Sequence, residues 1–473
     1  MKIRTLIGTL ATAGIALGVG QMTATAVPGA GGTSDSQAGP DVIVGGMPDV
    51  SKYGGATVNG VSIMAYAFGS TSCNIGTQQL DWYSGTSNHP IIPQNAYRIK
   101  NGRIEQIGLS WMKHGFCALQ QTLCGSCAPA GSGCPSLLGI GCSDPYTSSL
   151  NGTQGDLGPR SKVNASTGVF PADTAAETST WPSIPSGQSV IGRRVQINAN
   201  DLNPAQNAGA VYLAECQYVH PQDAANNNDN NNASYRLFTV GGLTSGAYTL
   251  TLAGSTFQQK PAIYHWGTVV PSVAYSVVDM ADGRFIVGYN VTPNTDGTYH
   301  YEYAIYNMNS DSSGGSFSVP IPAGVTVTNA TFKDIAYHSG EPYNGTDWAI
   351  SNSGGQLVWQ CTQTFAQNAN ANALRFGTLY NFAFDANSPG VSGNTALGVF
   401  KTGASIAVRG LVPATVCRSG DLDCNGIIDG ADLGSLLANW GPCPGGTTGC
   451  VGDLNNNGIV DGADLGTMLS NWG

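Results

Sequence analysis

Two stretches near the C-terminal end of the sequence carry oxygen-bearing side chains at the same spacing. GDLDCNGIIDGADLGSLLANWG begins at Gly420, and GDLNNNGIVDGADLGTMLSNWG begins at Gly452. Counted from the first aspartate, side-chain oxygens fall at positions 1, 3, 5, 9 and 12 of each copy, and position 6 is glycine. These residues are Asp421, Asp423, Asn425, Asp429 and Asp432 in the first copy and Asp453, Asn455, Asn457, Asp461 and Asp464 in the second.

Oxygens at this spacing can surround a calcium ion. Calcium takes about six to eight oxygen ligands, and glycine at position 6 lets the loop turn sharply, as in an EF-hand loop. The backbone carbonyls of Ile427 and Ile459, at position 7, supply a further oxygen. Turns rich in Asp and Asn that bind no metal are the alternative, but two copies in register argue against it. We therefore expect two Ca²⁺ ions with a structural role.

Two departures from an EF-hand indicate a particular family. Position 12 is Asp in both copies, and the apolar pattern predicts a helix after each loop but none before it. This arrangement resembles the dockerin repeat of secreted bacterial proteins, and the resemblance covers residues 418–473. Apolar residues at helical spacing predict one stripe on each helix, and we expect the two stripes to pack on each other. They are Leu433, Leu436, Leu437 and Trp440, then Leu465, Met468, Leu469 and Trp472.

The dockerin resemblance implies a docking or assembly module with a protein partner. Classical members bind cohesin domains through their helices and through loop positions 10 and 11, which usually carry hydroxyl or similar side chains. Here these positions are Gly430 and Ala431, then Gly462 and Ala463, which argues against a cohesin partner. An intramolecular or cell-surface role is the alternative.

So small a module buries little apolar surface and usually needs additional stabilisation. With external calcium near 1 mM and a dissociation constant of order 10 μM, each site would add about 2.7 kcal/mol. We also expect Cys424 to form a disulfide with Cys443 or Cys450. Cys417 would then form a disulfide with the other of these two cysteines.

Twelve cysteines predict six disulfides in an oxidising compartment. Cys124 and Cys127 form a C-x-x-C motif, but neither a thioredoxin-like pattern nor a second such pair accompanies it, so structural disulfides are favoured over redox or zinc chemistry. The cysteines form three even groups, and the sequence leaves their connectivity open. The groups are Cys73, Cys117, Cys124, Cys127, Cys134 and Cys142; Cys216 and Cys361; and Cys417, Cys424, Cys443 and Cys450.

The first residues have the order of a secretory signal peptide. Lys2 and Arg4 precede a weakly apolar run, and Ala24, Thr25 and Ala26 offer a small-residue cleavage site. The run is shorter than the roughly 20 apolar residues of a membrane span. We expect a signal peptide at 1–26, a linker at 27–43, no membrane span, and a protein that is secreted or held at the cell surface.

The composition favours strands and turns. Charged residues make up 10% of the chain, against roughly 25% in typical soluble proteins, and 65 residues are glycine. The net charge is −10, and acidic residues concentrate in residues 418–473. Because the sequence has no basic stripe, nucleic acid is not an expected partner.

The pattern of residues 44–413, the body of the chain, predicts many short strands. Alternation around Asn101 and Gly102 predicts a hairpin over 96–108. Further strands are predicted at 211–220, 247–257, 284–291, 299–308 and 323–332, with a turn at 310–316. The predicted fold class is mainly β: a Cys-rich β domain at 44–260 and a β-sandwich domain at 261–413, both carried before the small α-helical dockerin-like module at 418–473. NNNASYR at 230–236 and LRFGTLYNFAFDANSPG at 374–390 are similar to segments of secreted bacterial proteins of unassigned function.

The body shows no complete catalytic motif. A metal site built from distant histidines, such as His89, His114 and His220, is an alternative to packed or surface histidines. A glycoside hydrolase usually needs two carboxylates. Of the five glutamates, Glu302 lies among aromatic residues, where packing within a sheet is the favoured explanation. The glutamates are Glu105, Glu177, Glu215, Glu302 and Glu341.

Two functions follow from these features. The favoured one is a secreted or cell-surface protein that is not an enzyme and carries a calcium-stabilised, dockerin-like docking module. The alternative is a secreted enzyme of the glycoside hydrolase type that acts on polysaccharide and carries the same module for attachment. A cluster of acidic or histidine side chains converging in a cleft would favour the enzyme.

Overall fold

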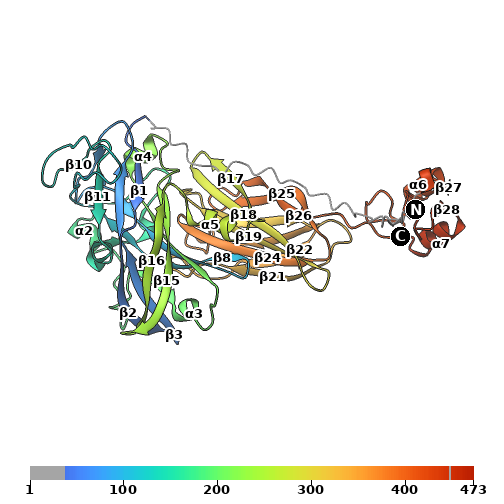
Figure 1. Cartoon of the computed structure of the whole chain (residues 1–473), viewed down its shortest axis with the longest axis horizontal. Helices are drawn as coiled ribbons and strands as arrows, with labels where there is room; N and C mark the ends of the chain where they lie inside the picture. The colour runs from blue at the N-terminus through green and yellow to red at the C-terminus, as the bar shows by residue number, and fades with distance from the viewer. Residues whose placement is uncertain (1–37, 447–448) are drawn as a thin grey trace, which may run out of the picture.

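The computed structural model describes residues 38–446 and 449–473 and arranges them in three parts along one long axis (Figure 1). An eight-stranded sheet lies at one end, two five-stranded sheets follow, and helices α6 (Gly430–Ala438) and α7 (Gly462–Ser470) lie at the other end. The predicted signal peptide and most of the predicted linker lie outside the described residues. None of the helices in the described ranges has the length and apolar character needed to cross a membrane.

An antiparallel sheet of eight strands organises the first part, in the order β16-β15-β14-β7-β8-β13-β3-β2. The predicted hairpin is confirmed: Asn101 and Gly102 join β7 to β8 with φ values of 52° and 80°, the left-handed values that a two-residue hairpin turn requires. The strands are β2 (Val50–Val58), β3 (Val61–Phe68), β7 (Gln94–Lys100), β8 (Arg103–Leu109), β13 (Val195–Asn198), β14 (Val211–Gln217), β15 (Ala233–Thr244) and β16 (Ala247–Phe257).

Short strands and turns surround this sheet, and three disulfides hold them: Cys73–Cys124, Cys117–Cys134 and Cys127–Cys142. Because the two cysteines of the C-x-x-C motif pair with different partners, their predicted structural role is confirmed. The short elements are β1 (Val42–Gly46), β4 (Ser70–Asn74), β5 (Leu80–Asp81), β6 (Ile91–Ile92), β9 (Met112–His114), β10 (Leu137–Leu138), β11 (Ser143–Tyr146), β12 (Leu157–Gly158), α1 (Ser148–Asn151), α2 (Ala175–Thr178), α3 (Ala199–Leu202) and α4 (Pro221–Ala225).

The prediction of six disulfides is wrong, because the described residues, 38–446 and 449–473, form five. Cys216 and Cys361 are both buried and free. Cys216 lies on β14 in the eight-stranded sheet, whereas Cys361 directly follows β23 in a different sheet. An even number of cysteines therefore did not require that every one be paired.

Two antiparallel five-stranded sheets make up the second part and enclose one apolar core. Their orders are β17-β18-β19-β24-β21 and β22-β23-β20-β25-β26. Tyr303 from the first sheet meets Phe317 from the second, and Phe317 stacks on Trp359; all three are fully buried. The strands are β17 (Ala274–Met280), β18 (Gly283–Pro293), β19 (Tyr299–Asn307), β20 (Gly314–Pro320), β21 (Val327–Lys333), β22 (Ala349–Ser353), β23 (Gln356–Gln360), β24 (Thr378–Ala386), β25 (Gly390–Val399) and β26 (Ser405–Pro413).

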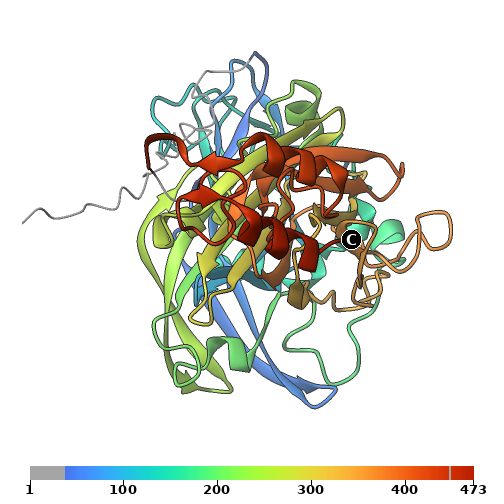
Figure 2. The same cartoon turned by 90° about the vertical axis from the view of Figure 1, so that its right-hand side faces the viewer.

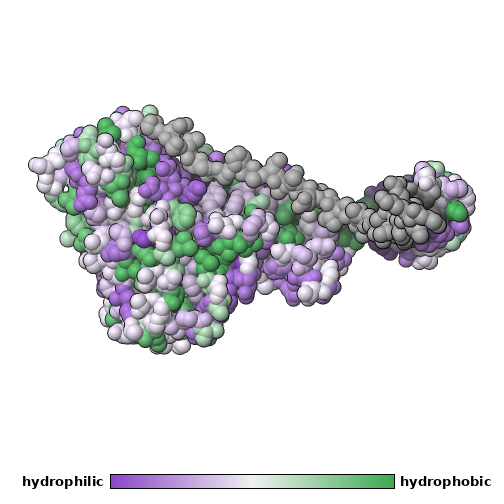
Figure 3. Space-filling model, viewed as in Figure 1, coloured by the Kyte–Doolittle hydropathy of each residue, from purple (hydrophilic) through white to green (hydrophobic). Residues whose placement is uncertain are grey.

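The prediction of a mainly β chain with several disulfides is thus confirmed. Two predicted boundaries shift. The strand predicted at 323–332 begins at Val327, after Gly324 adopts a left-handed φ of 77°. β20 begins at Gly314, inside the turn predicted at 310–316. On the face shown in Figure 3, hydrophilic and hydrophobic residues are interspersed over both β parts.

A buried carboxylate joins the first two parts. Glu215 on β14 is 1% exposed and accepts hydrogen bonds from Asn95 Nδ2 (2.9 Å), the Tyr97 hydroxyl (2.8 Å), the Tyr306 hydroxyl (3.2 Å) and the backbone N–H of Ala262 (2.7 Å). These donors come from β7, from β19 and from the short 3-10 helix η3 (Ala262–Tyr264). One side chain therefore connects elements of both parts.

Replacing Glu215 with leucine is expected to lower the free energy of unfolding by about 3 kcal/mol, because its donors would stay buried without an acceptor. Urea unfolding followed by tryptophan fluorescence measures this change. Asp279→Leu is the matched control: Asp279 forms an exposed ion pair with Arg284, and its loss is expected to cost less than about 1 kcal/mol. Equal losses in the two variants would contradict the role assigned to Glu215.

Candidate metal centre

The two repeated loops adopt the same hydrogen bonding. In the first loop, Asp421 Oδ1 accepts from the backbone N–H of Asn425 at 3.1 Å, and its Oδ2 accepts from that of Gly426 at 2.9 Å. The equivalent bonds of Asp453 in the second loop measure 3.0 and 2.9 Å. The aspartate at position 1 therefore fixes the backbone turn at positions 5 and 6 in both copies.

Position 6 requires glycine in both loops. Gly426 has a φ of 89° and Gly458 a φ of 87°, values that other residues rarely adopt. A side chain on Gly426 would also collide with Ala323 of the preceding β part. The turn predicted from the sequence is therefore present, and it brings the first loop against the body.

The aspartate at position 12 closes each loop. Asp432 is fully buried; its Oδ1 accepts from the backbone N–H groups of Leu422 (2.7 Å) and Asp423 (3.2 Å), and its Oδ2 from that of Asp429 (2.9 Å). Asp464 makes the equivalent bonds at 2.8, 3.2 and 2.8 Å. One carboxylate thus connects the start of the loop to the helix that follows it.

Position 9 begins each helix. Asp429 and Asp461 are the N-caps of α6 and α7, and each accepts from the backbone N–H two residues later at 2.8 Å. At position 5, Asn425 Oδ1 accepts from the backbone N–H of Ile427 at 2.8 Å, and the second loop repeats this bond between Asn457 and Ile459 at 2.9 Å. Helix capping and local turns therefore account for part of the aspartate and asparagine content.

The pKa values of Asp432 and Asp453 lie below their usual value. Burial raises the pKa of Asp432, but the backbone N–H groups of Asp429, Asp423 and Leu422 outweigh it and hold the pKa below its usual value. For Asp453 burial again raises the pKa, and backbone N–H donors, with that of Gly449 the largest, outweigh it. Both carboxyl groups are therefore negatively charged at neutral pH.

Negative charge gathers in the first loop, and among residues 38–446 and 449–473 no basic side chain forms a salt bridge with its carboxylates. Carboxylate oxygens of Asp421, Asp423 and Asp432 lie within 4.8 Å of one another. Arg418 is the single basic residue of residues 418–473, and its guanidinium donates to the backbone carbonyl of Gly473 at 3.0 Å. Carboxylates at such separations repel one another unless a cation lies between them. An oxygen-only donor set of this kind fits a hard divalent cation.

The second loop differs in one ligand position. Asn455 replaces an aspartate at position 3, and its Oδ1 accepts from the backbone N–H of Asn457 at 3.0 Å. The Cys443–Cys450 disulfide lies beside Asp453, with Cys443 Sγ 3.6 Å from Asp453 Oδ2. Because both sulfurs are used in the disulfide, this cysteine pair does not add metal ligands.

The predicted bridge from Cys424 to the second repeat is wrong. Cys424 pairs with Cys417, and Cys443 pairs with Cys450, so each disulfide closes a short segment within its own half. The reason is local: Cys424, at loop position 4, has a left-handed φ of 59°, and the loop turns back toward the segment that enters it.

The two halves are related by an approximate twofold arrangement. β27 (Gly441–Pro442) pairs with β28 (Ile459–Val460) of the second loop, and the N–H of Gly473 donates to Ile428 of the first loop at 3.1 Å. Each half therefore ends against the loop of the other half. Figure 2 shows α6 and α7 side by side. The buried core consists of matched pairs: Ile428 and Val460, Leu436 and Met468.

Half of the predicted apolar stripe faces solvent. Leu437, Trp440, Leu469 and Trp472 are 51%, 50%, 51% and 46% exposed. α6 ends at Ala438 and α7 ends at Ser470, so both tryptophans lie beyond the helices and do not follow the helical period. The remaining predicted stripe residues, Leu433, Leu436, Leu465 and Met468, do pack in the core.

The glutamate considered for sugar chemistry is sealed inside the protein. Glu302 has a side chain that is 6% exposed and lies 3.0 Å from Arg103 Nε, and it also accepts from Asn381 Nδ2 at 3.2 Å. Burial raises its pKa, while His300, Arg103 and Asn381 oppose the shift. Its contacts tie β19 to β8 and β24, which agrees with a packing role.

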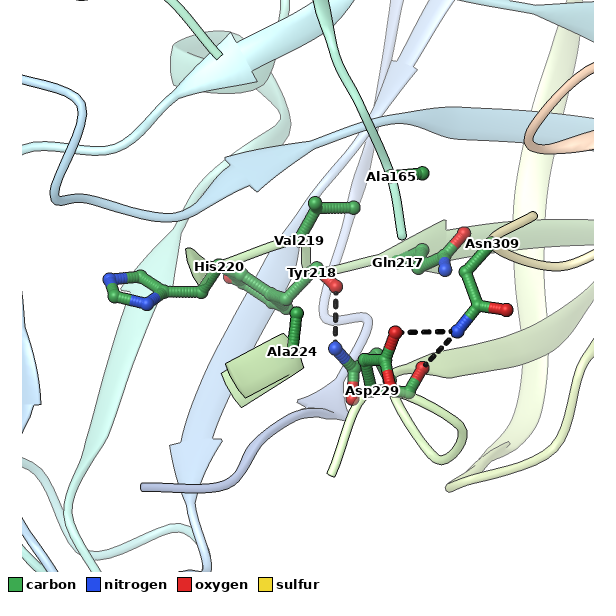
Figure 4. Close-up of a pocket in the computed structure, with 9 residues that line it drawn as sticks. Ala165, Gln217, Tyr218, Val219, His220, Ala224, Asp229 and Asn309 are labelled. Atoms are coloured by element: carbon green, nitrogen blue, oxygen red, sulfur yellow. Dashed lines mark hydrogen bonds between the residues drawn. The ribbon is translucent and has the colours of Figure 1, made fainter. Parts of the chain in front are cut away.

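A small pocket between the two β parts presents a single carboxylate (Figure 4). Asn309 Nδ2 donates to Asp229 Oδ2 at 2.7 Å, and Asn232 Nδ2 donates to the carbonyl of Tyr218 at 2.8 Å. Burial raises the pKa of Asp229 to about 6. The pocket lining therefore lacks the two carboxylates that glycoside hydrolysis normally uses.

Comparison with known proteins identifies neither a family nor a function for the chain. No known family matches the sequence, and no curated protein matches it. The chain is similar to the serine-rich repeat adhesion glycoprotein of Streptococcus agalactiae, at 9% identity over 81% of this chain and 98% of that chain, with a TM-score of 0.19. It is also similar to the exo-chitosanase of Amycolatopsis orientalis, at 9% identity over 73% of this chain and 25% of that chain, with a TM-score of 0.15. At these TM-scores neither similarity supports an argument.

Gly426→Ala is expected to destabilise the first loop by about 1–2 kcal/mol, because alanine disfavours the left-handed conformation and would meet Ala323. Hydrogen–deuterium exchange of α6 in the full chain measures the loss as faster exchange. Gly430→Ala, where a methyl group meets open space, is the control and is expected to leave exchange unchanged or slower. Equal exchange rates of α6 in the two variants would contradict the requirement for glycine at position 426.

Proposed function

We propose that residues 418–473 form a dockerin-like module that binds two structural Ca²⁺ ions and attaches an extracellular β body to a protein partner. The observation that carries the proposal is the repeated loop geometry: the aspartates at positions 1 and 12 accept the same backbone hydrogen bonds in both loops, and the carboxylates of the first form no salt bridge within the described residues. When bound, Ca²⁺ would supply the positive charge that offsets the repulsion between these carboxylates.

An extracellular location is supported by the disulfides. Five disulfides hold turns in the first part and both halves of the C-terminal module. Disulfides form and persist in oxidising compartments and are rare in the cytosol. The signal peptide predicted at residues 1–26 agrees with this location.

Attachment is supported by the apolar residues that the module leaves in solvent. Leu437 and Trp440 in the first half are matched by Leu469 and Trp472 in the second, and each is about half exposed. Tryptophan is enriched at the energetic centres of protein interfaces. The proposed partner is therefore a protein with an apolar groove. The dockerin resemblance supports such a partner, and Gly430, Ala431, Gly462 and Ala463 at the usual contact positions disfavour a classical cohesin.

Calorimetric titration of the full chain with Ca²⁺ is expected to show two sites. Asp432→Asn should remove the first and Asp464→Asn the second, because each loses the carboxylate that closes its loop. Asp279→Asn, on the β body, should retain both sites. Deuterium exchange of α6 and α7 should slow on adding Ca²⁺. A full chain that takes up no Ca²⁺ at millimolar concentration would overturn the proposal.

Ligand charge is expected to rank the two sites. The first loop has four aspartates among its side-chain ligands and the second has three. Asp423→Asn should weaken the first site by about tenfold, and the reciprocal Asn455→Asp should strengthen the second, because calcium affinity follows ligand charge. Unchanged affinities in both variants would contradict this ranking.

The docking surface is tested with a partner captured on the full chain in Ca²⁺ and then purified for calorimetry. Trp440→Ser with Trp472→Ser is expected to weaken the complex by at least about tenfold, since buried tryptophans dominate interface energies. Leu243→Ser, an exposed apolar residue on the β15–β16 hairpin, is the control and should leave affinity unchanged. Equal affinity of the tryptophan variant and the parent would exclude this surface.

A further inference from the structure

Three segments far apart in the sequence bring two histidines and an aspartate together beside the eight-stranded sheet. His89 lies two residues before β6, His114 is the last residue of β9, and Asp173 lies two residues before α2. β6 and β9 are paired with Ile91 opposite His114, which places the two histidine-bearing segments side by side. No sequence spacing connects Asp173 with the histidines, and for that reason the sequence did not indicate it.

We propose that His89 Nε2, His114 Nδ1 and the carboxylate of Asp173 bind one Zn²⁺ ion. His89 Nε2 lies 3.0 Å from His114 Nδ1, and His114 Nδ1 lies 4.0 Å from Asp173 Oδ2. The three ligand atoms all lie within 4.8 Å of one another. Ligands about 2.0–2.1 Å from a tetrahedral zinc are about 3.3 Å apart, so binding would draw Asp173 toward the two histidines by up to about 1.5 Å.

The groups behind the ligands favour this arrangement. His89 Nδ1 lies 3.3 Å from the backbone carbonyl of Tyr83, which holds the proton on Nδ1 and leaves the lone pair of Nε2 directed at His114. Histidine ligands of metals usually donate their second N–H to such an oxygen. The contact also fixes the orientation of the ring before a metal arrives.

The second histidine is held by its surroundings. The ring of His114 lies between Phe170 and Trp181, with ring centres 5.5 and 5.4 Å away. A side chain on Gly158 of β12 would collide with His114 Nε2, so glycine at this position gives the ring its space. The imidazole therefore has little freedom to turn away from His89.

The donor atoms of the cluster suit a divalent cation. His89 and His114 each offer a ring nitrogen beside the carboxylate of Asp173, and neutral imidazole is the form that binds metal. Asp173 Oδ1 is buried without a hydrogen-bond partner in the described part of the chain. The neighbouring cation, Lys113, is paired with Asp156 at 2.6 Å. Imidazole ligands select zinc over calcium.

His220, which the sequence grouped with these two histidines, is not a ligand. Its Nε2 lies 2.9 Å from the carbonyl of Asp81, and its Nδ1 accepts from the backbone N–H of Gln222 at 3.1 Å. Asp173, and not His220, is the third proposed ligand. With three protein ligands, the fourth position of a tetrahedral zinc is left to water, which reaches the site where the Asp173 side chain is 24% exposed.

The test is titration of the metal-free full chain with Zn²⁺, and with Co²⁺ as a spectroscopic substitute, in millimolar Ca²⁺ so that the C-terminal loops do not compete. One Zn²⁺ per chain is expected, with the visible absorption of tetrahedral Co²⁺. His89→Gln and Asp173→Asn should each weaken binding by at least about tenfold. His300→Gln is the matched control, because His300 also contacts an aspartate, Asp385, at 2.7 Å, but belongs to a different sheet.

Three outcomes would overturn the site. They are a chain that binds no Zn²⁺ at micromolar concentration, binding that survives in both His89→Gln and Asp173→Asn, and a Co²⁺ spectrum of octahedral type. Circular dichroism of the variants before titration separates loss of the ligand from loss of the fold. Ca²⁺ binding at residues 418–473 is measured separately, so failure here leaves the proposed module unaffected.

Discussion

The need to satisfy buried polar groups governs the junction between the two β parts. Glu215 accepts hydrogen bonds from both parts, and Asn95, one of its donors, also accepts from Arg160 at 2.9 Å. The guanidinium of Arg160 in turn donates to the carbonyls of Gln94 and Gly377. A carboxylate or guanidinium buried without such partners would cost several kcal/mol. Since these partners come from segments far apart in the sequence, the network fixes how the two β parts meet.

The charged side chains of the β parts are few, and most of them have polar partners. Most charged side chains of the β parts are paired or hydrogen-bonded: Glu302 lies beside Arg103, Lys113 beside Asp156 and Lys401 beside Asp311. The clustered aspartates of the first C-terminal loop differ, because they accept backbone hydrogen bonds but form no salt bridge within the described residues. This contrast supports the proposal that they bind a cation.

The three parts of the molecule are stabilised by different means. The eight-stranded sheet is flanked by turns that three disulfides hold, and the paired five-stranded sheets enclose an aromatic core. The C-terminal module has only a small apolar core around Leu436 and Met468. In a module of that size, the two disulfides supply stability that hydrophobic burial alone does not, and the proposed Ca²⁺ ions would add to it.

The sequence by itself determined the features that depend on neighbours along the chain. Asn101 and Gly102 specify a hairpin turn through their own backbone preferences, and the loop aspartates are placed by bonds to residues within about one loop length. The mainly β character follows from the same local alternation of apolar and polar residues. These interactions are encoded in spacing, so they can be predicted from it.

Only the tertiary structure decided which distant residues meet. Cys216 and Cys361 stay apart because one lies in the eight-stranded sheet and the other follows a strand of a different sheet. The pairing of β6 with β9 brings His89 beside His114, and Asp173 reaches them from a segment that no spacing connects with theirs. Leu437 and Trp440 fit a helical stripe in the sequence, yet both are about half exposed: Leu437 lies on the face of α6 that is turned away from the core, and Trp440 lies beyond the end of the helix. Burial and long-range contact depend on the whole fold, because a surface is covered only when another segment arrives to cover it.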